Sequence, residues 1–436
     1  MKKILLIVGL ATGVAAPLFA GETLRLNLVP DRDVLLRNRP QEIVVKIDLQ
    51  ALADRHRHQR TPLNLAVVLD RSGSMAGAKL EKTKQAALQL VDRLAPDDVF
   101  SLVIYSDQAQ VLVPAQKVED KDDIREKIEG IEADGCTALY AGVKAGARQL
   151  RENFSHKRIN RVILLSDGLA NVGPSSPRDL RRLGRELAEQ GIAVTTIGVG
   201  DDYNEDLMAG LAEASDANYY YVQDTEKLPE IFARELGEML TVAVREVRIE
   251  VVCPDGVKPL GFIGRPEQFE GQKAEVNLSQ FASGQGRYLM LRCLVSRPEP
   301  EVARVNVSYT DELDNGSAQS AAGVARVRFT DDPTVSDKSV DAAVTAEKAL
   351  MLTAVAKDEA IVQADAGNFR EAAVTLANQR NALGAAYANA PAAVQVQIRA
   401  ETNNLLNFSD QLNDGSYGSA TRKTLQSQSY NTRNSK

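Results

Sequence analysis

Three stretches of the sequence carry oxygen-bearing side chains at points where buried strands are expected to end. In the first, an apolar run ends at Asp70, and Ser72 and Ser74 follow at alternate positions. In the second, Thr137 stands just before a helical pattern, and in the third Asp167 closes another apolar run. Loops after neighbouring parallel strands converge on one edge of a sheet, so we expect these five side chains to meet.

Five oxygen ligands in one crevice suit a small divalent cation. Mg²⁺ or Mn²⁺ fits this ligand type best, and Ca²⁺ is a further candidate. Only two of the five groups are carboxylates, which leaves a divalent ion under-neutralised and with an open coordination position. An aspartate or glutamate of a partner protein is the natural ligand for that position. The chemistry predicted is therefore metal-dependent protein binding rather than catalysis.

Each stretch also has a simpler interpretation on its own. The hydroxyls of Ser72, Ser74 and Thr137 could instead cap the helices that follow them. Asp167 and Gly168 could form an ordinary turn. The occurrence of all three stretches, in order and at strand ends, favours a metal site over these alternatives.

The region 61–240 alternates between strand and helix patterns, which predicts a mostly parallel sheet with helices on both faces. The expected strands lie at 65–69, 99–105, 110–113, 161–166, 193–198 and 218–222. The expected helices lie at 79–94, 121–131, 139–153, 177–190, 205–213 and 227–240. Because only a short turn separates 110–113 from the strand before it, we expect an antiparallel edge strand there. The predicted fold class is α/β, with a doubly wound sheet.

With these five oxygen ligands and this alternation of strands and helices, residues 61–240 resemble a von Willebrand factor type A (VWA) domain. The metal-ion-dependent adhesion site (MIDAS) of that family has the pattern D-x-S-x-S, then a Thr, then an Asp, which the chain matches at Asp70, Ser72, Ser74, Thr137 and Asp167. The resemblance implies that the three hydroxyls coordinate the metal directly and that the two carboxylates often act through water. It also implies a doubly wound fold and metal-dependent protein binding.

One position departs from the family pattern. Cys136 precedes the threonine where relatives often have glycine, and a soft thiol is a poor ligand for Mg²⁺. We therefore expect an altered loop backbone rather than loss of the site. The layout, with a β-rich segment after the domain and an export signal before it, resembles bacterial exported members of the family.

The segments on either side of this region have different patterns. Residues 21–60 and 241–332 alternate polar and apolar side chains, which predicts β-strands. Too few strands follow the α/β region to form a sandwich alone, so we expect the N-terminal strands to complete one, with the α/β domain inserted between its two parts. Residues 333–412 have apolar side chains at helical spacing, which predicts a helical region. The polar residues 413–436 predict a flexible tail unless that segment docks on the rest of the chain.

A stretch within the helical region, Ala364–Ala372, resembles the middle of one tetratricopeptide repeat. No second copy follows, and one repeat cannot bury its own apolar face. A helical hairpin packed on the rest of the chain and a peptide-binding surface are both open interpretations.

The N-terminus and the charge bear on the compartment and on partners. A basic start, an apolar run and a small residue at Ala20 predict a signal peptide at 1–20. No later run is long and apolar enough for a membrane helix, so we expect a mature chain in the periplasm or outside the cell. The net charge of −7 argues against nucleic acid as the main partner. The sequence gives no indication of the oligomeric state.

The cysteines and histidines add little further chemistry. Cys253 and Cys293 both fall in strand patterns, and a disulfide between them is one of two open alternatives, with Cys136 as the odd thiol. His56 and His58 lie in a polar connector with no third ligand nearby, which favours a solvated linker over a metal site.

These observations favour a non-enzymatic, metal-dependent adhesion or protein-binding module of the cell envelope. The alternative is an envelope scaffold whose metal is structural and whose helical C-terminal region carries the partner contacts. Phosphatases of the haloacid dehalogenase type also use a strand-end aspartate and Mg²⁺, but they need a second acid two residues on, where this chain has Ser72. No Walker motif and no G-x-S-x-G motif occurs in the sequence.

Overall fold

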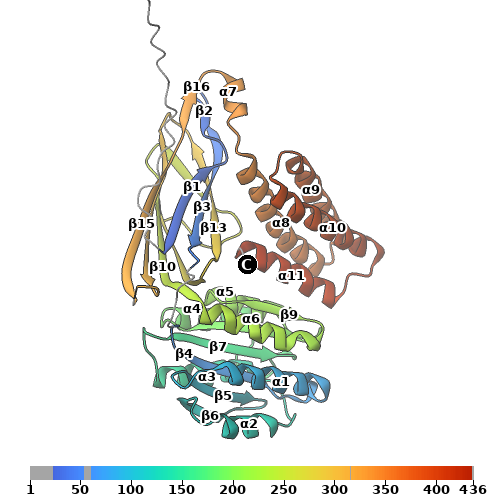
Figure 1. Cartoon of the computed structure of the whole chain (residues 1–436). Helices are drawn as coiled ribbons and strands as arrows, with labels where there is room; N and C mark the ends of the chain where they lie inside the picture. The colour runs from blue at the N-terminus through green and yellow to red at the C-terminus, as the bar shows by residue number, and fades with distance from the viewer. Residues whose placement is uncertain (1–22, 54–59, 315, 435–436) are drawn as a thin grey trace, which may run out of the picture.

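The computed structural model describes residues 23–53, 60–314 and 316–434. The signal peptide expected at 1–20 and the pair His56 and His58 lie outside these residues. Figure 1 shows three bodies in the described chain: an α/β domain, a β-sandwich stacked on it, and a group of helices beside the sandwich.

A six-stranded sheet forms the centre of the α/β domain, with the strand order β6-β5-β4-β7-β8-β9. The strands pair in parallel except for β6, which is antiparallel to β5 at the edge, as the short turn between them predicts. All residues of β4, β5, β7 and β8 are buried, because helices cover both faces of the sheet. The strands are β4 (Leu63–Asp70), β5 (Val99–Tyr105), β6 (Ala109–Lys117), β7 (Ile159–Ser166), β8 (Ala193–Val199) and β9 (Tyr219–Val222).

Helices pack on both faces of this sheet and enclose two separate apolar cores. Side chains of α1, α2 and α6 fill one core, and side chains of α3, α4 and α5 fill the other. The arrangement confirms the predicted fold class. The helices are α1 (Ala78–Arg93), α2 (Lys121–Glu129), α3 (Leu139–Glu152), α4 (Pro177–Ala188), α5 (Glu205–Ala214) and α6 (Leu228–Leu240), with short 3₁₀ turns η1 (Gly73–Met75) and η2 (Thr225–Lys227).

Two four-stranded antiparallel sheets form the sandwich, with the orders β1-β3-β13-β11 and β12-β10-β14-β15. β3 pairs with β13, so that Ile47 lies opposite Leu289, and the chain leaves the sandwich after β3 and returns at β10. The α/β domain is therefore inserted between two parts of one sandwich. The strands are β1 (Leu24–Pro30), β2 (Val34–Leu36), β3 (Gln41–Ala51), β10 (Val242–Val252), β11 (Val257–Phe262), β12 (Lys273–Ala282), β13 (Gly286–Val295), β14 (Glu301–Asp311), β15 (Ser317–Arg326) and β16 (Arg328–Thr330), of which β2 and β16 form a separate parallel pair.

The two cysteines of the sandwich come from different sheets. Cys293 lies in β13 and Cys253 directly follows β10, and both side chains are buried. Their sulfur atoms are 4.0 Å apart, and both are free thiols in the structure.

The helical region begins after β16. Its helices are α7 (Pro333–Lys338), α8 (Ala342–Asp365), α9 (Phe369–Tyr387), α10 (Ala392–Asp414) and α11 (Ser419–Arg433). The stretch that resembles a tetratricopeptide repeat spans the turn between α8 and α9, where Gly367 has a φ of +82°. Among the residues that the structure describes, no helix has the length and apolar character needed to cross a membrane.

The expectation of a flexible tail at 413–436 is wrong for most of that segment. α10 extends to Asp414, and α11 is a helix of 15 residues. The polar composition favours disorder, but Leu425 and Tyr430 of α11 are fully buried. The order of this helix therefore comes from its packing on other parts of the chain.

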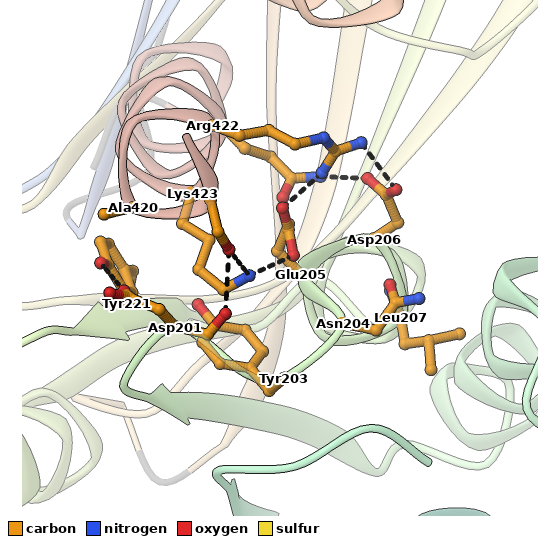
Figure 2. Close-up of polar contacts among 12 residues, drawn as sticks. Asp201, Tyr203, Asn204, Glu205, Asp206, Leu207, Tyr221, Ala420, Arg422 and Lys423 are labelled. Atoms are coloured by element: carbon orange, nitrogen blue, oxygen red, sulfur yellow. Dashed lines mark hydrogen bonds and ion pairs between the residues drawn. The ribbon is translucent and has the colours of Figure 1, made fainter. Parts of the chain in front are cut away.

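Polar contacts attach α11 to the start of α5. Figure 2 shows Arg422 and Lys423 reaching from α11 to Glu205 and Asp206. The Lys423 ammonium donates to Glu205 Oε2 at 2.6 Å, and the Arg422 guanidinium contacts both carboxylates. Specific partners in the α/β domain thus replace the water that would solvate a disordered tail.

Candidate metal centre

Two of the predicted site residues, Asp70 and Asp167, lie at the ends of neighbouring strands. β4 ends at Asp70, and Asp167 follows the last residue of β7. Because β4 and β7 are adjacent and parallel, their carboxyl ends reach the same edge of the sheet. Both side chains are fully buried. This edge is where open α/β sheets hold their ligands.

The two serines connect these carboxylates. The Ser72 backbone N–H donates to Asp70 Oδ1 at 2.8 Å, which places the turn directly over the strand end. The Ser74 hydroxyl donates to Asp167 Oδ1 at 2.7 Å, and the hydroxyls of Ser72 and Ser74 lie 3.1 Å apart. Neither hydroxyl caps a helix, since η1 has no side-chain cap and the N-cap residue of α1 is Gly77.

Thr137 joins the group from a third loop. A Cβ atom placed on Gly168 would lie 3.2 Å from Thr137 Oγ1, 3.3 Å from Ser74 Oγ and 4.0 Å from Ser72 Oγ. The three hydroxyls therefore surround the glycine that follows Asp167, at a position without a side chain. The structure brings together all five residues that the sequence pattern predicts.

The loop that carries Thr137 is held by contacts other than a helix cap. The N-cap residue of α3 is Ala138, with no side-chain hydrogen bond, so the capping interpretation of Thr137 is wrong. The Thr137 backbone N–H donates instead to Asn171 Oδ1 at 2.9 Å. Asn171 follows Asp167 by four residues, so the third loop and the Asp167 loop position each other.

The donor set fits a small hard cation. It consists of two carboxylates and three hydroxyls, and the hydroxyls converge in front of Gly168. Nowhere in the described ranges do three or more His, Cys, Asp or Glu side chains gather as a metal cluster. This group contains only two such residues, so it depends on hydroxyls for its other ligands. Ser74 is exposed whereas Ser72 and Thr137 are buried, so the group opens to solvent on one side.

The electrostatics of the two carboxylates also favour a cation. Burial raises the pKa of Asp70 above its usual value, and the negative charge of Asp167 acts in the same direction. Hydrogen bonds from Ser72 and Ser166 oppose this rise. A cation at this edge of the sheet would relieve the repulsion between the two carboxylates.

Two residues beside the site are not predicted by the sequence pattern. Lys79 Nζ lies 2.6 Å from Asp167 Oδ2, and Asn171 holds the Thr137 backbone. The available signal for Lys79 is its place in the first turn of α1, where the helix dipole disfavours a cation.

The loop with Cys136 accommodates the thiol without an unusual backbone at that residue. Gly135, which precedes it, has the left-handed φ of +79°. The Cys136 backbone N–H donates to Asp107 Oδ1 at 3.0 Å. The thiol is exposed, and the neighbouring Asp107 raises its pKa.

The comparison with protein families agrees with the fold of the α/β domain. Residues 64–234 match the family described as von Willebrand factor type A domain. This stretch of the chain therefore matches a VWA domain, and VWA domains are typically metal-dependent protein-binding modules.

Two bacterial relatives are similar in sequence. "Uncharacterized protein sll0103" of Synechocystis sp. is 30% identical over 281 residues, which cover 61% of this chain and 66% of that protein. "Uncharacterized protein YfbK" of Escherichia coli is 28% identical over 213 residues, which cover 48% of this chain and 37% of that protein. The chain thus spans 66% or less of the length of either relative.

Two solved structures share the fold across most of the chain. A von Willebrand factor type A protein from Catenulispora acidiphila aligns with a TM-score of 0.69 at 17% identity, covering 89% of this chain and 91% of its own. The ArnB paralog VWA2 from Sulfolobus acidocaldarius aligns with a TM-score of 0.64 at 17% identity, covering 95% and 98%. The shared fold therefore extends well beyond the VWA domain.

Proposed function

We propose that this chain is a metal-dependent protein-binding module of the cell envelope. Its metal site would consist of Asp70, Ser72, Ser74, Thr137 and Asp167. The observation that carries the proposal is the convergence of three loops at one sheet edge, with three hydroxyls around a glycine and two buried carboxylates behind them. Mg²⁺ or Mn²⁺ suits this set of oxygen donors, and Ca²⁺ is the less favoured candidate.

The ligand that we propose for the metal is an aspartate or glutamate of a partner protein. Two carboxylates and three neutral hydroxyls leave a divalent ion short of ligands and of negative charge, and the exposed Ser74 marks the open side. Leu169, two residues after Asp167, is 58% exposed and offers an apolar contact next to this opening. The metal would bind the carboxylate, and neighbouring side chains such as Leu169 would select the partner.

The proposed location is the periplasm or the outside of the cell. This part of the proposal rests on the signal-peptide pattern at 1–20. Fractionation of cells that produce the full chain, followed by mass analysis of its N-terminus, tests it directly. A chain that keeps its first residues and stays in the cytoplasm would contradict this location.

The first experiment is a thermal melt of residues 21–436 in EDTA and again with Mg²⁺ or Mn²⁺. A ligand that binds only the folded state stabilises it by about 2.7 kcal/mol at a hundredfold excess over Kd, so the wild type should melt at a higher temperature with metal. Asp70→Ala should show no such rise. Direct calorimetric titration of the metal accompanies the melts, and no binding by the wild type would contradict the metal site.

The second experiment measures partner binding. An envelope extract is passed over the immobilised protein with and without EDTA, and the retained proteins are compared for the wild type, Ser72→Ala and Thr137→Ala. Both variants should lose the EDTA-sensitive partner while remaining folded. Ser296→Ala, an exposed serine of the sandwich, is the matched control. Undiminished binding by both site variants would overturn the proposal.

A second candidate function is an envelope scaffold whose metal is structural. The observation that favours it is the exposure of apolar side chains on the helical region, such as Val362 at 68% and Val396 at 70%. Under this alternative the site variants bind the partner normally but melt earlier. Val362→Asp and Val396→Asp would then be the variants that lose the partner.

A further inference from the structure

Lys79 contacts the candidate metal site but is not part of the ligand set. Its ammonium lies 2.6 Å from Asp167 Oδ2, and the two side chains are 28% and 0% exposed. The other oxygen of Asp167, Oδ1, accepts a hydrogen bond from the Ser74 hydroxyl at 2.7 Å. Both oxygens of this carboxylate are therefore engaged, one by a neutral donor and one by a positive charge.

The location of Lys79 makes this contact informative. Lys79 lies in the first turn of α1, which begins at Ala78. The N-terminal end of a helix carries a partial positive charge, so a lysine there is unfavourable unless a carboxylate compensates it. Asp167 is that carboxylate.

The turn after β8 limits where the ammonium can lie. A Cβ atom placed on Gly200 would be 3.6 Å from Lys79 Nζ and 3.7 Å from its Cε. Asp201 is the next residue of this turn. Its backbone carbonyl accepts a hydrogen bond of 2.9 Å from the hydroxyl of Ser419 in α11. The lysine thus lies between Asp167 and a turn that α11 contacts.

We propose that Lys79 sets the charge balance of the metal site and so couples metal binding to the partner's carboxylate. This inference rests on the proposed function. The two aspartates and Lys79 together carry a charge of −1, a divalent ion brings the site to +1, and one partner carboxylate returns it to zero. Without Lys79 the metal alone would neutralise the two aspartates, and the incoming carboxylate would add an uncompensated negative charge.

Two consequences follow for the binding of the metal and of the carboxylate. Lys79 weakens metal binding, because a positive charge next to Asp167 repels the ion and competes for its oxygen. It also strengthens the binding of a carboxylate to the metal-loaded site, and by thermodynamic linkage the carboxylate then strengthens metal binding by the same factor.

The test is a calorimetric titration of Mn²⁺ and Mg²⁺ into the wild type, Lys79→Met and Lys79→Gln. Each metal is titrated in chloride and in acetate buffer of equal ionic strength, acetate being the carboxylate probe. Both variants should bind metal at least about tenfold more tightly than the wild type in chloride. Acetate should tighten metal binding by the wild type and have a smaller effect on the variants.

Lys82→Met is the matched control. Lys82 lies on the same helix, is also 28% exposed, and pairs with Glu226 at 2.7 Å, away from the site. It should bind metal as the wild type does. Lys79→Arg, which keeps the charge, should also resemble the wild type. In EDTA, Lys79→Met should melt below the wild type, because Asp167 loses its counter-charge, and saturating metal should close that gap.

The outcomes separate this inference from the proposed function. If the wild type binds metal and the two neutral variants bind it equally or more weakly, the role of Lys79 is overturned while the metal site stands. If neither the wild type nor the variants bind Mg²⁺ or Mn²⁺, the metal site fails and this inference fails with it. Lys79→Gln retains a hydrogen-bond donor toward Asp167. If Lys79→Met does not fold, the metal titration of Lys79→Gln alone decides the test.

Discussion

Replacing Lys423 by methionine tests whether a buried ion pair holds α11 on the VWA domain. Lys423 Nζ donates to Glu205 Oε2 at 2.6 Å, and the two side chains are 2% and 8% exposed. The ammonium also lies 4.7 Å from the centre of the Tyr203 ring. Methionine keeps the apolar stem but removes the charge, so that among the described residues Arg422, at 2.5 Å, remains as the cationic partner of Glu205 (Figure 2).

The size of the effect follows from the burial of the pair. Removing one partner of a buried ion pair costs about 3–5 kcal/mol, because the other charge is left unpaired in a poorly solvated place. Since Arg422 still contacts Glu205, we expect the lower end, about 3 kcal/mol, in the free energy of detaching α11. Each 1.4 kcal/mol is a factor of ten, so the detached state should become roughly a hundred times more populated.

Hydrogen exchange of the backbone amides at 419–433 measures this population, because those amides exchange when the helix detaches. Lys423→Met should lower their protection roughly a hundredfold and leave the amides of β4 unchanged. Lys338→Met, an exposed lysine of α7, is the control.

A loss of protection smaller than about threefold would refute the reasoning, since the pair would then make almost no net contribution. The double variant of Glu205→Gln with Lys423→Met provides a second check. Its cost should be smaller than the sum of the two single costs, because each single change already removes the same contact between Lys423 and Glu205.

Three further changes test the site and its surroundings. Gly168→Ala places a methyl group 3.2 Å from a site hydroxyl and should weaken metal binding by at least about tenfold in a calorimetric titration. Gly237→Ala, with nothing within 4 Å, should leave it unchanged. Asp70→Asn should abolish metal binding yet raise the Tm in EDTA at neutral pH, because the raised folded-state pKa of Asp70 means that its charge destabilises the fold there. That gain should shrink as the pH falls through the folded-state pKa, and an equal or lower Tm at neutral pH would contradict it. Gly198→Ala would place a methyl group 2.1 Å from the buried Tyr203 ring and should cost about 1–3 kcal/mol in urea unfolding, and an unchanged stability would contradict this.

The α/β domain is predictable because its strands are buried on both faces. Such strands are continuous apolar runs, and the run 99–105 predicts β5 with its observed bounds. The short connection after it correctly predicts an antiparallel edge strand at β6. The proximity of Asp70 and Asp167 follows from the same rule, because each lies at the end of a parallel strand, and β4 and β7 prove to be neighbours.

The helix at the C-terminus is not predictable in this way. Its sequence is polar, with few apolar residues at helical spacing, and composition alone favours disorder. Its order depends on partners far away in the chain, since Lys423 and Glu205 are separated by 218 residues. No local pattern contains information about such a contact.

The sequence by itself determined the α/β fold class and the five oxygen-bearing residues at strand ends, because the burial of the strands and their positions along the chain follow from local apolar patterns. Only the tertiary structure decided that three hydroxyls surround Gly168, that Lys79 pairs with Asp167 across 88 residues, and that α11 is ordered. These features depend on which side chains meet after folding. Distances between side chains on separate loops are set by the packing of the whole domain, and no short stretch of sequence specifies them.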